Sequence, residues 1–194
     1  PIEGLSTRHA KAAGIPGEPA GWAHLASNYG RLPLSVSLEP AIRLARQGYV
    51  LDERMQRDFG RVIRDEGLDK AADPSFARVY LVKGKVPPVG HRVRQPELAR
   101  SLEVLAKGGA DAFYRGPFAK KLVAGVQSLG GIWTVEDLAA YRVVEREPVV
   151  TTYRGLRVVS APPPSSGGVW LATVLNVLSG YDLGQFDSVT RKHL

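Results

Sequence analysis

The sequence contains no cysteine. Disulfide bonds and zinc sites built on thiolates are therefore excluded, although the compartment stays open because a secreted protein need not carry disulfides. Histidine is scarce, and no two histidines have a close ligand spacing such as H-x-x-x-H; they are His9, His24, His91 and His193. The sequence accordingly predicts no metal site and no bound cofactor.

Long apolar runs and the common catalytic motifs are also missing. No stretch reaches the roughly 18 apolar residues that a membrane-spanning helix needs, so the sequence predicts no membrane span. The G-x-S-x-G elbow of serine hydrolases is absent, and so is the phosphate-binding G-x-x-x-x-G-K-[ST] loop. Neither of these two chemistries is therefore expected in this chain.

Acidic residues are outnumbered by basic ones, which gives a formal net charge of +7. Such a balance can indicate nucleic-acid binding. However, the arginines are scattered, and there is no run of five or more basic residues and no aromatic-rich RNA-binding motif. We therefore expect a solvated basic surface without a nucleic-acid partner. A non-catalytic basic binding module stays as an alternative, which predicts micromolar DNA binding with a steep salt dependence.

The composition, with 44% apolar residues, supports a buried core. Residues 1–140 are mainly helical by apolar spacing and by their start and stop signals. One helix is expected to contain Trp22 to Tyr29. A second is expected to begin near Leu38 and end before Gly48, and a third is expected to follow Asp52, which would be its N-cap. Three more are expected from Pro96 to a stop at Gly108-Gly109, from Pro117 to a stop at Gly130-Gly131, and after a Thr134–Asp137 capping box.

Strand signals are few. Val79, Leu81 and Val82 suggest a short strand. Residues 141–161 hold a clearer β-hairpin, with strands of about 147–153 and 156–160 joined at Arg154-Gly155. No repeated strand–helix–strand rhythm is visible, so we expect an α+β segment that is mostly helical and has one hairpin.

Residues 162–194 begin with the stretch PPPSSGG and continue into an apolar helix. This helix is apolar nearly all round, so it is expected to be buried, and its polar Asn176 is expected to find a partner. Ser165 or Ser166 can cap the helix, or the free N–H groups at its start can hold an anion. The first alternative is favoured on local physics. A further helix is expected after Asp187 or Ser188, and the unfinished ends suggest a piece of a longer polypeptide.

Several stretches, in this order along the chain, carry a family resemblance. They are GIPGEPAGWAHLASNYGRLPLSVSLEPAIRLARQGY, QPELARSLEVLAKGGADAFYRG, GGIWTVEDLAAYRVVEREPV, and YRGLRVVSA followed by PPPSSGG. PPPSSGG and the T-x-E-D-L-A-x-Y block are the specific ones. On these motifs the chain resembles the gamma-glutamyltranspeptidase family, as a partial large-subunit segment covering 1–194.

The resemblance implies an N-terminal nucleophile hydrolase, made as a zymogen that cleaves itself into a large and a small subunit. The two subunits share a four-layer αββα sandwich. A threonine at the start of the small subunit attacks the gamma-glutamyl amide of glutathione or a related compound, and its own α-amine is the natural general base. Water or an acceptor amine then resolves the acyl-enzyme. Many bacterial members are periplasmic or secreted.

The resemblance also implies that the nucleophile lies outside this chain, so that the chain alone is inactive. No catalytic residue carries over: the surroundings of Arg8 do not match the family's substrate-gripping arginine, and Thr151-Thr152 falls in the expected hairpin. Candidate pocket-lining residues are Ser165, Ser166, Gly167 and Gly168. The expected partner is the small subunit, and a lone segment is expected to self-associate through uncovered apolar surface. A related acylase or amidohydrolase is the alternative enzyme.

Overall fold

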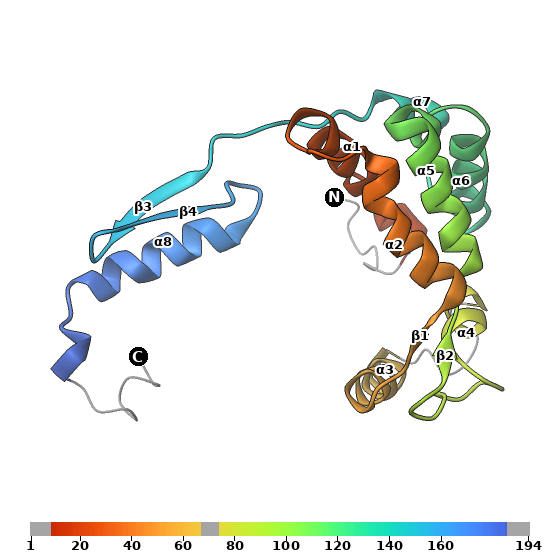
Figure 1. Cartoon of the computed structure of the whole chain (residues 1–194), viewed down its shortest axis with the longest axis horizontal. Coiled ribbons are helices and arrows are strands. Elements are labelled where there is room, and N and C mark those ends of the chain that lie inside the picture. The colour runs from red at the N-terminus through yellow and green to blue at the C-terminus, as the bar shows by residue number, and fades with distance from the viewer. Residues whose placement is uncertain (1–8, 67–73, 186–194) are drawn as a thin grey trace. The chain divides into compact units, whose positions relative to one another are not determined.

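The computed structural model describes residues 9–66 and 74–185, which belong to two compact units, Pro1–Val143 and Val144–Leu194 (Figure 1). The first unit is helical and the second is a β-hairpin with one long helix. The described part thus confirms the α+β class, with helices dominant and one clear hairpin. The helix expected after Asp187 or Ser188 lies outside the described residues.

The first unit is built from seven α-helices within the described residues. Two pairs pack along each other: α2 with α5, and α5 with α6 (Figure 1). The helices are α1 (Glu18–Asn28), α2 (Leu34–Gln47), α3 (Glu53–Glu66), α4 (Pro74–Tyr80), α5 (Pro96–Tyr114), α6 (Gly116–Ser128) and α7 (Val135–Ala140), preceded by a 3-10 turn at Ala10–Ala12.

The predicted start signals are confirmed at two helices. The Asp52 carboxylate accepts a hydrogen bond from the Met55 N–H at 2.7 Å and so caps α3. At α7, the Thr134 hydroxyl accepts from the Asp137 N–H, while the Asp137 carboxylate accepts from the Thr134 N–H at 2.9 Å. This reciprocal capping box satisfies two backbone donors that a helix start leaves free.

The predicted start of α2 near Leu38 is wrong, because the helix begins at Leu34 and Pro40 lies inside it. Proline removes one helical hydrogen bond, so a helix is expected to start close to it. In α2 the first turn is held by other hydrogen bonds, which do not need an N–H at Pro40. The Pro33 carbonyl accepts from the N–H groups of both Val36 and Ser37 at 3.1 Å.

The strand predicted around Val79–Val82 is also wrong. Val79 lies in α4, where the tilted rings of Phe76 and Tyr80 are in contact one turn apart, with centroids separated by 5.0 Å. Val82 instead pairs with Lys85 across a tight turn. Two short antiparallel strands that the sequence did not reveal are β1 (Tyr49–Val50) and β2 (Arg92–Val93).

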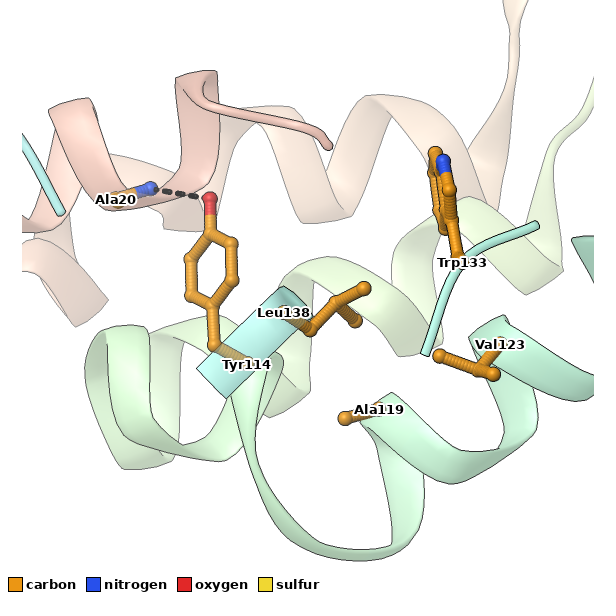
Figure 2. Packing of buried hydrophobic residues seen from close by; sticks show 6 residues of the cluster. All are labelled: Ala20, Tyr114, Ala119, Val123, Trp133 and Leu138. Atoms are coloured by element: carbon orange, nitrogen blue, oxygen red, sulfur yellow. Dashed lines mark hydrogen bonds between the residues drawn. The ribbon is translucent and has the colours of Figure 1, made fainter. Parts of the chain in front are cut away.

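The first unit has two buried clusters: one, of Leu38, Leu102 and Leu105, joins α2 to α5, and the other forms where α1, α5, α6 and α7 meet (Figure 2). The buried members of this second cluster are Ala20, Tyr114, Ala119, Val123, Trp133 and Leu138. The Tyr114 hydroxyl accepts from the Ala20 N–H at 3.2 Å and donates to the Pro16 carbonyl, so the buried ring keeps its polar atom paired. The hydroxyl thereby ties the start of α1 to the end of α5.

The predicted stop at Gly108-Gly109 is a break rather than an end. Gly109 has φ 61° and ψ −158°, which is not helical, and helical geometry then resumes as far as Tyr114. Glycine is the residue that adopts this conformation without a Cβ penalty. The break redirects the last turn of α5, which carries Tyr114 into the core described above.

The hairpin of the second unit is confirmed. It consists of β3 (Val149–Tyr153) and β4 (Leu156–Ser160), with Arg154 at φ 49° and Gly155 at φ 82° in its turn. These positive φ values match the two-residue turns that suit the twist of a hairpin. Helix α8 (Ser166–Ser179) runs along the hairpin, followed by a 3-10 turn at Leu183–Gln185 (Figure 1).

The predictions for α8 have mixed outcomes. Asn176 finds its partner, because the Thr151 hydroxyl donates to its side-chain oxygen at 3.3 Å. The expected burial is wrong for this chain taken by itself. Among the described residues of the second unit only Gly168 is buried, while Trp170 is 67% and Val177 is 59% exposed.

Candidate functional site

The candidate site from the sequence is the turn that leads from β4 into α8. Ser165 is the N-cap residue, with extended backbone angles, and its N–H donates to the Pro162 carbonyl at 3.1 Å. However, no side-chain hydrogen bond caps the helix, and Ser166 is already its first residue. The prediction that a serine hydroxyl caps α8 is therefore wrong, although the capping position itself is right.

The four residues of this turn differ in exposure. Ser165, Ser166 and Gly167 are exposed, whereas Gly168 is buried. A Cβ on Gly168 would collide with the Ala161 carbonyl and lie 3.2 Å from the Ser160 Cβ. Backbones therefore pack closely at Gly168. The first N–H groups of α8, which no helical carbonyl pairs, begin among the exposed residues.

The threonine pair lacks what an N-terminal nucleophile needs. Thr151 and Thr152 lie within β3, so the nitrogen of each is part of a peptide bond and offers no α-amine as a base. Thr151 is half-buried and its hydroxyl is bound to Asn176. Thr152 is exposed and stands opposite Arg157. Arg8 lies outside the described residues.

Sequence reasoning missed a polar hollow of about 670 Å³ in the first unit. His24, Asn28, Asp111, Arg115 and Arg142 are among the residues that line it. The two arginines have partners inside the unit. The Arg115 Nε lies 3.1 Å from the Asp111 carboxylate, and the Arg142 guanidinium donates to the Ala139 carbonyl at 2.7 Å. The i, i+4 spacing of Asp111 and Arg115 is the signal that the sequence offered.

An apolar hollow of about 610 Å³ lies between α1 and α2. It is lined in part by residues of the segment that the sequence predicted to be helical, including Trp22, Leu25 and Tyr29. Leu25 is 58% and Tyr29 is 66% exposed. Leu25 and Tyr29 therefore lie on the surface of this unit, whereas Trp22 is partly buried against the cluster of Leu38, Leu102 and Leu105.

Titratable groups with shifted pKa values are few among the described residues. Burial raises the pKa of Tyr49 and of Tyr114, and the hydrogen bonds from the Thr134 side chain and N–H lower the pKa of the Asp137 carboxyl. Each of these groups has a packing or capping role. No set of three or more potential metal ligands comes together in the described part, and no helix there is long and apolar enough to cross a membrane.

The local geometry does not identify a protein family, whereas comparison with known proteins does. The sequence profile described as "Gamma-glutamyltranspeptidase" matches residues 2–194. The chain is 39% identical over 187 residues to the acylase ACY 1 proenzyme of Pseudomonas sp. (strain SE83), and covers 33% of that protein. It is 36% identical over 179 residues to the glutathione hydrolase proenzyme of Escherichia coli (strain K12), and covers 30% of it. These alignments take in 95% and 90% of this chain.

Solved structures agree with these relatives. The gamma-glutamyltranspeptidase of Helicobacter pylori matches 96% of this chain with a TM-score of 0.85 at 35% identity, over 53% of its own length. A cephalosporin acylase from Bacillus halodurans matches 97% of this chain with a TM-score of 0.86 at 35% identity, over 35% of its length. The chain spans about a third of the length of the curated relatives named above.

Proposed function

This chain belongs to the gamma-glutamyltranspeptidase family, and on that premise we propose that it is part of a gamma-glutamyltransferase or glutathione hydrolase. The reaction is cleavage of a gamma-glutamyl amide through an acyl-enzyme on an N-terminal threonine that lies outside this chain. Water or an acceptor amine then takes up the gamma-glutamyl group. The match of the family profile over residues 2–194 is the observation that carries the proposal.

The contribution of this chain is architectural. Its helices and its hairpin supply one part of the αββα sandwich, and the small subunit of the same precursor supplies the nucleophile. The absence of a free threonine α-amine in β3 supports this division of labour. We expect the chain alone to be inactive and to self-associate through the apolar surface that it leaves open.

The turn of Ser165, Ser166, Gly167 and Gly168 is proposed to line the active-site region of the complete enzyme. Three of the four residues are exposed, and the start of a 14-residue helix carries partial positive charge that suits a carboxylate. Because no serine hydroxyl caps the helix, Ser166→Ala in the complete enzyme should cost little stability. Because Ser166 is proposed to line the site, the same change should raise KM for a gamma-glutamyl substrate. Lower stability with unchanged kinetics would assign Ser166 a purely structural role.

An acylase acting on another amide is the second candidate. It is favoured by the acylase relative at 39% identity and by the cephalosporin acylase structure. The two activities differ in the acyl group that the enzyme accepts, so a matched pair of substrates separates them. A gamma-glutamyl anilide and a glutaryl anilide have the same carbon chain, and only the first carries the α-amino group.

The test is the ratio of kcat/KM for these two anilides with the complete, processed protein. A ratio of about 100 or more in favour of the gamma-glutamyl substrate is expected, because an enzyme that binds the α-amino group loses those interactions with the analogue. A preference for the glutaryl substrate would assign the acylase activity. No turnover of either anilide would contradict both candidates.

A further inference from the structure

The polar hollow of the first unit has no role in the proposed function. Its volume of about 670 Å³ lies in the range of pockets that hold small molecules. Its walls come from α1, from α5 at the break of Gly108 and Gly109, and from the end of α7 with the residues that follow it. All of its lining residues belong to the same compact unit. The hollow therefore does not depend on how the two units are arranged.

The charges that line the hollow do not balance. Its basic residues are Arg115 and Arg142, whereas Asp111 is the one acidic residue among those that line it. The Asp111 carboxylate lies 3.1 Å from the Arg115 Nε and so neutralises one guanidinium. In the described part of the chain no carboxylate pairs with Arg142, whose two hydrogen-bond acceptors are uncharged carbonyls. One positive charge is therefore left over.

The Arg142 guanidinium is held in place and still has donors to offer. Both of its hydrogen bonds come from Nη1, to the Ala139 and Tyr141 carbonyls at 2.7 Å. A guanidinium carries five N–H donors in a fixed fork. The edge formed by Nε and Nη2 thus has no acceptor among the described residues. Such an edge binds a carboxylate through two parallel N–H···O bonds.

The second guanidinium lies close to the first. The Arg115 Nη2 donates to the same Ala139 carbonyl, at 3.4 Å, that accepts from Arg142. Like charges so close to each other repel, and a bound anion would offset this repulsion. Both arginines therefore favour an anion in the hollow.

The remaining lining suits the body of an organic molecule. The rings of Tyr114 and Tyr141 are stacked at an angle of 9°, with centroids 5.5 Å apart. Alanines leave room beside them, and Ala20 is labelled next to Tyr114 in Figure 2. The three alanines on α1 and α5 that line the hollow are Ala20, Ala23 and Ala110. A flat apolar group would find aromatic and methyl contacts in this part of the hollow.

We propose that the polar hollow binds a small organic molecule through its carboxylate group, and that Arg142 is the residue that holds this group. The single excess positive charge favours a carboxylate, which carries one negative charge, over a phosphate group, which carries up to two. The proposal does not rest on the proposed function, because it uses residues of the first unit alone.

The test is protection of Arg142 from phenylglyoxal, which modifies guanidinium groups, in the complete, processed protein. Peptide mass spectrometry reads the modification at each arginine. Benzoate is the probe, and benzamide is its uncharged counterpart of the same shape. We expect benzoate at about 10 mM to slow the modification of Arg142 about fivefold, as a Kd of about 2 mM implies, and benzamide to have little effect. Arg100, whose side chain is 65% exposed on α5 outside the hollow, is the internal control and should react at an unchanged rate.

Four results would overturn the proposal. The first is equal protection by benzoate and benzamide, and the second is equal protection of Arg100 and Arg142. The third is equal protection by inorganic phosphate at the same concentration, which would make the hollow a general anion site. The fourth is an Arg142 that phenylglyoxal does not reach even without benzoate, because the remaining polypeptide would then cover the site.

A pair of variants tests the affinity of the site. Arg142→Gln in the complete protein should weaken the binding of 4-fluorobenzoate, measured by fluorine NMR, about tenfold through the loss of charge-assisted hydrogen bonds. Arg100→Gln makes the same change outside the hollow and should leave the affinity unchanged. Equal affinities of the two variants would overturn the proposal.

Gamma-glutamyl hydrolysis, measured on the same samples, separates this site from the proposed function. Hydrolysis by a protein whose Arg142 is not protected would contradict the carboxylate site alone. Protection of Arg142 in a protein without hydrolysis would contradict the proposed function alone.

Discussion

Two adjacent glycines at the start of α8 have different surroundings. A Cβ on Gly168 would collide with the Ala161 carbonyl, whereas a Cβ on Gly167 would find only the Ser165 Oγ at 3.7 Å. The requirement for glycine is therefore steric at Gly168 and absent at Gly167. The sequence motif PPPSSGG contains one position of each kind.

Gly168→Ala in the complete protein should lower the free energy of unfolding by about 1–3 kcal/mol, because backbone must move to make room for the methyl group. The matched change Gly167→Ala should leave it unchanged or raise it slightly, since alanine is the better helix former. Urea denaturation measures both. Equal losses for the two variants would contradict the steric account.

Tyr114 is the residue whose hydroxyl joins α1 to α5. Tyr114→Phe leaves the Ala20 N–H without its acceptor and the Pro16 carbonyl without its donor. A loss of about 1–3 kcal/mol in the free energy of unfolding is expected. Tyr181→Phe, at a tyrosine that is 52% exposed, removes the same hydroxyl from the surface and should cost less than about 0.5 kcal/mol. A loss for Tyr114→Phe no larger than that for Tyr181→Phe would show that the buried bond contributes nothing.

The capping hydrogen bonds of Asp137 predict that the stability of the protein depends on pH. The hydrogen bonds from the Thr134 side chain and N–H lower the pKa of its carboxyl below the ordinary value of 3.8. The stability that the ionised carboxylate contributes is present above pH 3.8 and is lost as the pH falls through the lowered folded-state pKa. Asp137→Asn should therefore destabilise the protein at pH 7, and the difference in stability between the variant and the unchanged protein should become smaller in acid.

Thermal unfolding at several pH values measures this difference. Glu136→Gln, which removes a charge from the same turn of α7 without touching the Thr134 bonds, is the control at pH 7. If both variants lose the same stability at pH 7, the capping box is not the cause.

At the scale of elements, the sequence predicted best where one residue decides a helix start. Asp52, Pro117 and Thr134 each stand at the start of a helix, as predicted. Predictions depending on spacing over a few residues were weaker. Val79 lies in a helix, in which the rings of Phe76 and Tyr80 are in contact one turn apart. The strands at Tyr49–Val50 and Arg92–Val93 are two residues long, too short for any alternation to show.

The hairpin turn gives a prediction with an opposite-sign control. Gly155 has φ 82°, so Gly155→Ala should cost about 1–2 kcal/mol of unfolding free energy through the left-handed conformation. Gly125 is an exposed glycine inside α6, where a Cβ would meet nothing within 4 Å. Gly125→Ala should instead raise the stability by about 0.5–1 kcal/mol. Both are measured by urea denaturation, and a stable Gly155→Ala would contradict the turn geometry.

At the scale of the whole molecule, the resemblance in the sequence predicted the family, and local physics did not. No set of three or more potential metal ligands comes together among the described side chains, and Trp170 is 67% exposed although the sequence of its helix predicts burial. The proposed function explains both facts, because it assigns the groups that complete this chain to the rest of the same precursor. Burial cannot be read from a sequence when the covering surface is not in it.

The most direct test of the account is hydrolysis of a gamma-glutamyl anilide by two samples, the complete processed protein and residues 1–194 alone. We expect turnover by the complete protein and none above background by residues 1–194, because the proposed function places the nucleophilic threonine and its free α-amine outside this chain. The contradicting result would be turnover by residues 1–194 that is lost on Thr151→Ala or Thr152→Ala.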